Sequence, residues 1–428
     1  MIRRRSTLGG LVAILSTGQA PAIARQRSVH WLKWVDFVPE TDLLFRDELL
    51  PQAERELGLK IVLETVNGND LQPRLRGAIG AGNGPDLFMA FNEQPWLVAD
   101  ATVDLGGLAE TIAARDGGWA GYGRALCSDG RRFMALPWVT IGSLVAWRAS
   151  WLAEAGASAP PSDWDSYRSI GRALKARGRP IGQTLGHAFG DAPGFAYPYL
   201  WSWGGKEVEA DGRTVAIHSR ETIESVRFLQ GLWVDAMDPA GLDWDDTGNN
   251  RAFLARKIGA TLNGASIYLE ARRRPARYRT AAGTPLHADM VHAPLPAGPG
   301  GPRGFHLLQS ILLMRYAPEP DAAKAFLGWL YAPGNYGRFF RSQQGFSTPC
   351  TARWEGDPAW DADPVLAPFR VAARIGRAPG WPGPPHAGAA RSLARFIVPE
   401  MYARAVRGQS AAEAVAWADG ALRAAYAG

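Results

Sequence analysis

Residues 75–90 read LRGAIGAGNGPDLFMA, and this stretch combines a helix end, a turn and a buried strand. We predict a helix from about Leu71 to Ile79, because apolar residues recur there at helical spacing. The glycines of residues 80–84 and Pro85 predict a turn. Residues 86–90 form a short and mostly apolar run, which favours a buried strand. A strand that follows a helix so closely is typical of layered α/β proteins.

The residues before this stretch repeat the same order of elements. Residues 29–35 alternate between apolar and polar, which predicts a first strand, and residues 59–66 alternate again as a second. A helix over about 42–57, ending at Gly58, separates them. Strand, helix, strand, helix and strand at this spacing predict a parallel sheet with right-handed crossovers.

The rest of the chain continues with helices and short apolar strands. We predict helices that begin near Ser162 and Ser219, a buried strand over 257–262 and another strand over 307–314. The loop 294–302 is rich in proline and glycine, so it is a candidate crossover between domains. Near the end, Ser410 and Glu413 form a capping box before a last amphipathic helix.

The first 24 residues have the pattern of an export signal. Arg3, Arg4 and Arg5 are followed by a short apolar run over 8–15, and Ala22-Ile23-Ala24 resembles a cleavage site. The arginines also fit a twin-arginine signal, so both the general secretory route and the twin-arginine route remain open. We therefore expect cleavage near Ala24 and a mature protein in the periplasm.

Length and composition limit the class of protein. A chain of 428 residues with 46% hydrophobic residues is too long for one core, so two domains are expected. The formal charge of +6 falls to about +3 without the three signal arginines, which argues against a nucleic-acid partner. Cys127 and Cys350 could pair in an oxidising compartment or could be small buried residues.

Several segments carry a resemblance to one family. They are residues 75–87 (LRGAIGAGNGPDL), 134–138 (MALPW), 155–165 (AGASAPPSDWD), 201–212 (WSWGGKEVEADG), 293–301 (APLPAGPGG) and 344–349 (QGFSTP). Their order resembles that of the family 1 extracellular solute-binding proteins, which serve ABC importers of sugars and related solutes. The resemblance spans about residues 29–425. Two places depart from the usual pattern: the first strand carries Trp34 and Asp36, and residues 305–307 replace a common Gly-Gly.

The resemblance implies an α/β, two-lobed periplasmic binding protein fold. Each lobe would be a mainly parallel sheet flanked by helices, and crossover hinge segments would join the lobes. The expected division is a signal peptide over 1–24, lobe one over 25–138 plus 290–335, and lobe two over 139–289 plus 336–428. The implied function is capture of a mono- or oligosaccharide by hinge closure and its delivery to ABC permease subunits. We expect a monomer.

A sugar site needs aromatic faces for the apolar side of the ring, and donors and acceptors for the hydroxyls. Residues that follow strands are the candidates, because they lie at the carboxyl edge of a sheet. The predicted ligand-binding residues are Trp34, Asp36, Asn67, Asn92, Trp138, Trp201, Trp203, Asn263, Ser266 and His306. Each also has a structural interpretation: the tryptophans as core, the asparagines as turn residues and His306 as a packing residue.

Other functions remain as alternatives. Within the same class, the ligand could be a polyol or a sugar phosphate, and the arginines of 272–279 would suit an anion if they are not simply a solvated helix end. A secreted carbohydrate-active enzyme is the main rival. The sequence lacks G-x-S-x-G, H-E-x-x-H and P-loop motifs, and Leu254 replaces the last ligand of a possible calcium loop that starts at Asp243. We therefore predict no catalytic residue, no metal site and no cofactor.

Overall fold

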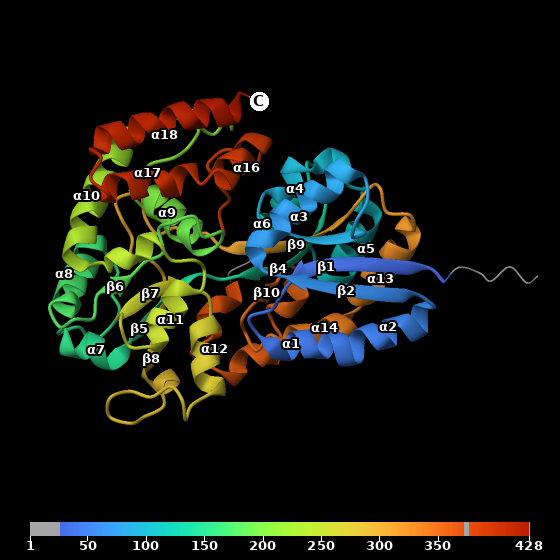
Figure 1. Ribbon diagram of the computed structural model, residues 1–428, viewed down its shortest axis with the longest axis horizontal. Coiled ribbons are helices and arrows are strands. Elements are labelled where there is room, and N and C mark those ends of the chain that lie inside the picture. Colours follow the sequence, from blue (N-terminus) through green and yellow to red (C-terminus); the bar gives the residue numbers. More distant parts are fainter. Residues whose placement is uncertain (1–25, 372–375, 428) are drawn as a thin grey trace, which may run out of the picture.

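The computed structural model describes residues 26–371 and 376–427, which form two lobes side by side (Figure 1). The predicted signal peptide lies outside the described residues. Among those residues, no helix has both the length and the hydropathy that crossing a membrane requires.

Six strands form the sheet of the first lobe in the order β10-β4-β9-β3-β1-β2. Their bounds are β1 Ser28–Trp34, β2 Lys60–Val66, β3 Leu87–Phe91, β4 Leu136–Ile141, β9 Leu307–Leu313 and β10 Thr348–Pro349. β1 runs parallel to β2 and β3, whereas β9 is antiparallel to its neighbours β3 and β4. The late strand β9 therefore completes the middle of a sheet that begins at the N-terminal end.

Helices cover both faces of this sheet. They are α1 Pro39–Leu44, α2 Leu50–Leu57, α3 Gly68–Ala81, α4 Gln94–Leu97, α5 Gly106–Asp116, α6 Gly121–Cys127, α13 Pro320–Leu330 and α14 Pro333–Ser342. The residues between α1 and α2 continue as a π-helix over Phe45–Leu49. α3 ends at Gly82, whose left-handed backbone (φ 64°) allows the turn predicted from the opening stretch.

The second lobe has a four-stranded sheet in the order β6-β7-β5-β8. Its strands are β5 Leu144–Arg148, β6 Ile181–Gly182, β7 Ala260–Asn263 and β8 Met290–Ala293. Its helices are α7 Ala149–Glu154, α8 Trp164–Lys175, α9 Asp191–Ser202, α10 Arg220–Ala236, α11 Gly248–Leu254, α12 Ser266–Arg273, α16 Ala387–Ala394, α17 Ile397–Val406 and α18 Ala411–Tyr426. β7 is parallel to β6 and antiparallel to β5.

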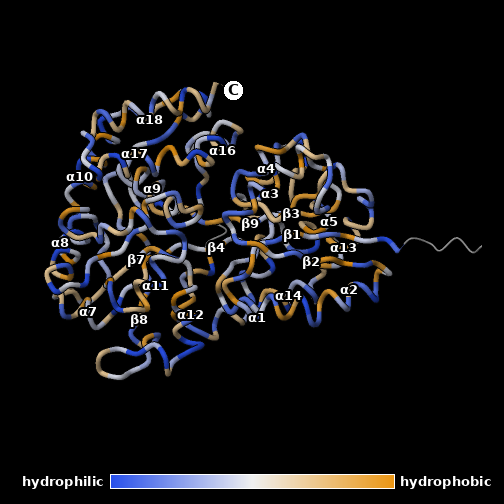
Figure 2. Tube along the Cα trace, viewed as in Figure 1, coloured by the Kyte–Doolittle hydropathy of each residue, from blue (hydrophilic) through white to orange (hydrophobic). Residues whose placement is uncertain are grey.

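The outer helices follow the amphipathic pattern that their sequences predict. Hydropathy alternates along α18, where the buried residues Ala411, Val415, Ala418 and Leu422 recur at helical spacing (Figure 2). The predicted capping box is present, since Ser410 Oγ accepts from the Glu413 N–H and the Glu413 carboxylate accepts from the Ser410 N–H. The apolar stripe of α18 packs against α16 and α17, which fixes the C-terminal end of the chain to the second lobe.

The predicted two-lobed α/β fold is confirmed, but two of its details need correction. Both sheets are mixed, not mainly parallel, because β9 and β5 each pair antiparallel on both sides. Strand pairing also moves the boundaries. The sequence prediction assigned β8 to lobe one, but β8 pairs with β5 of the second sheet. It assigned residues 336–371 to lobe two, but they contain β10, which pairs with β4 of the first sheet. Short strands show no preference in their own sequence for either sheet.

Within residues 26–371, the chain crosses between the lobes at two places. The first crossing is at residues 142–143 between β4 and β5, and the second is the loop 294–306 between β8 and β9. The residues from β9 to Val371 belong to the first lobe, and α16–α18 belong to the second. The predicted crossover loop 294–302 is part of the second crossing.

Candidate ligand-binding cleft

Aromatic side chains of both lobes meet where the lobes face each other. Trp34 ends β1 and Phe91 ends β3, so both lie at the carboxyl edge of parallel strands in the first lobe. Phe189 belongs to the loop 183–190 that precedes α9 in the second lobe. Its ring stacks on Phe91, with centroids 4.8 Å apart, and meets Trp34 edge-on at 5.7 Å. An aromatic cluster thus joins the two lobes.

The loop of Phe189 is held by a carboxylate. The backbone N–H groups of Phe189, Gly190 and Asp191 donate to Asp246 at 2.9, 3.0 and 2.7 Å. Burial raises the pKa of Asp246 to about 6, although these three hydrogen bonds oppose the rise. Burial and the nearby Asp246 also raise the pKa of Asp191, whose carboxylate accepts from Asn249 at 2.7 Å. The position of Phe189 is therefore set within the second lobe.

A small cavity of about 40 Å³ lies beside this aromatic cluster. Trp34 and Phe37 form its wall in the first lobe, and Asn263 and Ser266 contribute to its wall in the second. Ser266 Oγ donates to Asn263 Oδ1 at 2.8 Å and accepts from Asn250 at 3.0 Å. The space holds about one water molecule, whose share of liquid volume is about 30 Å³.

A second cavity, of about 170 Å³, also borders Phe189 and lies between α3, the loop after β3, and α16. The Glu93 side chain lines it and is only 1% exposed. Neither carboxylate oxygen of Glu93 has a hydrogen-bond partner among the described residues, and burial raises the pKa of Glu93 well above its usual range. The side-chain amides of Asn69 and Gln72 share the cavity. A cavity of about 150 Å³ can hold benzene, so one six-membered ring fits here.

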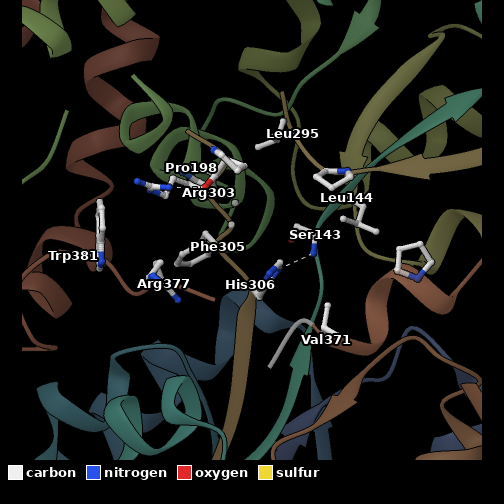
Figure 3. Close-up of a pocket in the computed structure, with 15 residues that line it drawn as sticks. Ser143, Leu144, Pro198, Leu295, Arg303, Phe305, His306, Val371, Arg377 and Trp381 are labelled. Atoms are coloured by element: carbon white, nitrogen blue, oxygen red, sulfur yellow. Dashed lines mark hydrogen bonds between the residues drawn. The ribbon is translucent and has the colours of Figure 1, made fainter. Parts of the chain in front are cut away.

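A third cavity, of about 550 Å³, lies at the crossings between the lobes (Figure 3). Ser143 and Leu144 of the first crossing and residues 302–306 of the second line it, together with Val371 and Trp381. His306 Nδ1 accepts from the Ser143 N–H at 3.1 Å, which ties the two crossings together.

Four of the predicted site residues lie on the cleft. Trp34, Asn263 and Ser266 meet at the small cavity, and Asn92 lines the cavity of Glu93. Asn92 also has a structural role, because its side-chain oxygen accepts from the Leu308 N–H at 2.9 Å and so fixes β3 to β9. His306 lies at the crossing instead, where it lines the cavity of about 550 Å³.

The other five residues line neither of the two cavities beside Phe189. Asn67 caps α3, and Asp36 accepts from the Val38 N–H and from Gln343. Trp138 is 1% exposed and packs in the first core against Phe339, at 4.3 Å between centroids. Trp201 and Trp203 pack in the second lobe against Tyr197 and Phe228, respectively. None of these three tryptophans lines either of the two cavities beside Phe189.

The sequence reasoning missed Phe189 and Asp246 as candidate site residues. Glu93 follows the same strand as Asn92 and fits the strand-end criterion, but it is not among the predicted ligand-binding residues. Phe189 follows no long strand, and nothing in its local pattern marks it. Asp246 stands in the acidic loop after Asp243, where its role as an acceptor for a distant loop depends on tertiary structure.

Two lobes joined by crossing segments, with a mixed aromatic and polar face between them, define a cleft-type binding protein. The chain belongs to the bacterial extracellular solute-binding protein family, whose pattern matches residues 40–337. A protein of Deinococcus radiodurans named "Probable ABC transporter-binding protein" is 22% identical over 178 residues. That match covers 40% of this chain and only 40% of the relative's length.

Solved structures with the same fold extend over nearly the whole chain. The GacH receptor of Streptomyces glaucescens, solved free and with acarbose, matches at a TM-score of 0.77, with 17% identity over 94% of this chain and 99% of its own. A sugar transporter protein of Arthrobacter chlorophenolicus with bound laminaribiose matches at 0.75, with 16% identity over 93% and 99%. Maltose-bound MalE3 of T. maritima matches at 0.74, with 17% identity over 92% and 99%.

Proposed function

We propose that this chain is an exported receptor that captures a mono- or oligosaccharide between its lobes and delivers it to an ABC importer. The observation that carries the proposal is the pairing of aromatic rings and hydroxyl-binding groups across one cleft. Trp34 and Phe91 of the first lobe offer aromatic ring faces. Hydrogen-bond donors and acceptors come from Glu93 and Asn69 of the first lobe and from Asn263 of the second. Apolar faces and hydroxyl rims of sugars need this combination.

Closure of the two lobes supplies the mechanism. The two cleft cavities, about 40 and 170 Å³, are smaller than the roughly 300–1,000 Å³ of typical ligand sites. An oligosaccharide therefore enters while the lobes are apart and displaces part of the contact that Phe189 makes. Contacts to both lobes then favour the closed state, because a ligand shifts the equilibrium only by its difference in affinity for the two states.

The family and the bound ligands of the similar structures support a sugar. Maltose, laminaribiose and acarbose are the ligands named for the three structures above. No chemical step is required of such a receptor. We propose the periplasm as its location, permease subunits as its partners and a monomeric state.

Isothermal titration of residues 25–428 against maltose, laminaribiose, hexoses, polyols and sugar phosphates tests the proposal. We expect one sugar to bind and to be recovered unchanged. Asn69→Ala should weaken that binding several-fold, as expected for one hydrogen bond worth about 1 kcal/mol. Asn83→Ala is the control, because Asn83 is an exposed residue just after the same helix and lines neither cleft cavity. A folded protein that binds no sugar, or that converts it to products, would refute the proposal.

A further inference from the structure

The cavity at the crossings is separate from the cleft face. His306 lines this cavity, whereas the next residue, Leu307, lines the small cleft cavity with Trp34. Consecutive residues of an extended chain point to opposite sides. The segment at 305–307 thus lies between the two spaces, and among the described residues only Ser143 borders both.

The walls of this crossing cavity are largely apolar. Leucine, proline, phenylalanine and tryptophan side chains supply most of them: Leu144, Pro198, Pro294, Leu295, Phe305 and Trp381. At about 550 Å³, it falls within the range of sites that hold small organic molecules.

The polar groups on these walls are mainly donors. Arg303 and Arg377 lie on neighbouring segments, since the Arg377 N–H donates to the Gly304 carbonyl at 3.1 Å, and Figure 3 shows Arg377 beside Trp381. The Arg303 guanidinium lies 5.1 Å from the Trp381 ring, and its Nε is buried without a hydrogen-bond partner. None of the described lining residues is an aspartate or a glutamate, so the cavity walls are positively charged.

His306 adds a further donor. Its side chain is 2% exposed, and its Nδ1 accepts from Ser143, so in the neutral ring the hydrogen resides on Nε2. Burial lowers the pKa of His306 to about 4, which keeps the ring neutral at physiological pH. Nε2 has no partner among the described residues, although a buried polar atom normally has one.

We infer that the crossing cavity is a second binding site, and that its ligand is a small organic anion with an apolar body, such as an aromatic or alkyl carboxylate. The carboxylate supplies acceptors for Arg303 and His306 Nε2 beside the positive charge of Arg377, and the apolar body packs on Phe305 and Leu295. This inference does not depend on which solute the cleft binds. It differs from the cleft proposal in ligand class, since a neutral sugar would bring no negative charge to Arg303, whose Nε is buried.

Thermal-shift and titration experiments with benzoate, phenylacetate and hexanoate, each beside its neutral amide, test this inference. We expect at least one carboxylate to bind about tenfold or more tightly than its amide, because hydrogen bonds to charged groups are worth about 1.5–3 kcal/mol. Arg303→Gln and Arg377→Gln should each abolish that preference while the protein still unfolds cooperatively. Arg220→Gln, in an exposed arginine of α10, is the matched control and should retain it.

Three results would overturn the inference. The first is the absence of any carboxylate binding to the wild-type protein. The second is equal binding of acid and amide. The third is carboxylate binding that survives both arginine variants but is lost in Asn69→Ala, which would place the anion in the cleft. Loss of sugar binding in Asn69→Ala with carboxylate binding intact would support two separate sites.

Discussion

At the scale of single residues, buried carboxyl groups are the most informative feature. Glu93, Asp246 and Glu207 all have raised pKa values because burial disfavours the charged form. Glu207 is fully buried; it accepts hydrogen bonds from Tyr197 at 3.2 Å and from the Gly380 N–H at 2.6 Å. It therefore joins α9 to the segment that leads into α16.

Substitution of Glu207 should change how stability depends on pH. Burial raises its pKa to about 7 from an ordinary value of 4.5, so the folded protein holds this proton more tightly than the unfolded chain. The stabilisation is complete below about pH 4.5 and is lost as the pH rises through about 7. The pKa difference corresponds to about 3 kcal/mol. Between pH 5 and 8, the free energy of unfolding of the wild type should therefore fall by up to about 3 kcal/mol more than that of Glu207→Gln.

Chemical denaturation at pH 5, 6, 7 and 8 measures this dependence. Glu209→Gln is the control, because Glu209 is half-exposed and pairs with Lys206 on the surface. If Glu207→Gln and the wild type show parallel curves, Glu207 does not hold its proton in the folded state.

At the scale of elements, α3 decides how closely the lobes approach each other. A Cβ atom on Gly68, the first residue of α3, would lie 2.6 Å from the Phe189 ring. Real Cβ contacts are not so short, so the absence of a side chain at this position permits the aromatic contact between the lobes. Gly77, further along α3, has open space where a Cβ would be placed.

We predict that Gly68→Ala disfavours the closed state. Displacement of Phe189 from Phe91 costs about 1 kcal/mol of aromatic contact, which lowers the ratio of closed to open molecules about fivefold. Small-angle scattering should show a larger radius of gyration. Gly77→Ala should leave scattering unchanged and increase helix stability by up to about 1 kcal/mol.

A double variant provides the decisive comparison. In a Phe189→Ala background the added methyl group of Gly68→Ala has no ring to meet, so its effect on scattering should disappear. An effect that persists without the ring would show that Gly68 acts through the helix itself.

The elements also show how far sequence patterns reach. Alternation located β1 and β2, and an apolar run located β9. The glycines of 80–84 located the end of α3 and the start of β3 within a few residues. Capping chemistry located α18. The two-residue β10 is too short to show a pattern, and the sequence of β8 does not indicate which sheet it joins. The lobe boundaries therefore depend on pairing between segments that are distant in the sequence.

The same limit applies to the site. Trp34, Asn263 and Ser266 were found because strand ends meet at one edge of a sheet. Trp138 was a candidate because of its place near an expected hinge, and Trp201 because of its place before a Gly-Gly turn. Neither signal distinguishes a side chain that packs in a core from one that lines a cleft. Phe189 enters the cleft from the other lobe, and such a contact is visible only in three dimensions.

At the scale of the whole molecule, a set of polar contacts joins the lobes near α12. Asp363 of the first lobe accepts from Tyr268 at 2.7 Å and from Arg272 at 2.6 Å, and Arg272 also donates to Gln344. Arg273 lies 3.7 Å from Glu40. Much of the arginine-rich run of 272–279 that the sequence offered as a possible anion site is thus engaged with carboxylates of the protein.

We predict that Asp363→Asn shifts the lobes toward the open state. The ion pair is partly exposed, so its loss should cost about 1 kcal/mol and should matter less at high salt, where charges are screened. Scattering at 50 and 500 mM NaCl should show an expansion of the variant that is larger at the lower salt concentration. Asp235→Asn, which breaks pairs with Arg168 and Arg172 inside the second lobe, should not expand at either concentration.

The position of β9 has a consequence for how the newly made chain folds. β9 separates β3 from β4, and the contact that ties it to β3 joins Asn92 to Leu308, 216 positions later. At roughly 5–20 residues per second, a ribosome needs on the order of 10–40 seconds to supply that partner. Until then β3 and β4 have no strand between them to pair with, so the first sheet stays incomplete until most of the chain has been made.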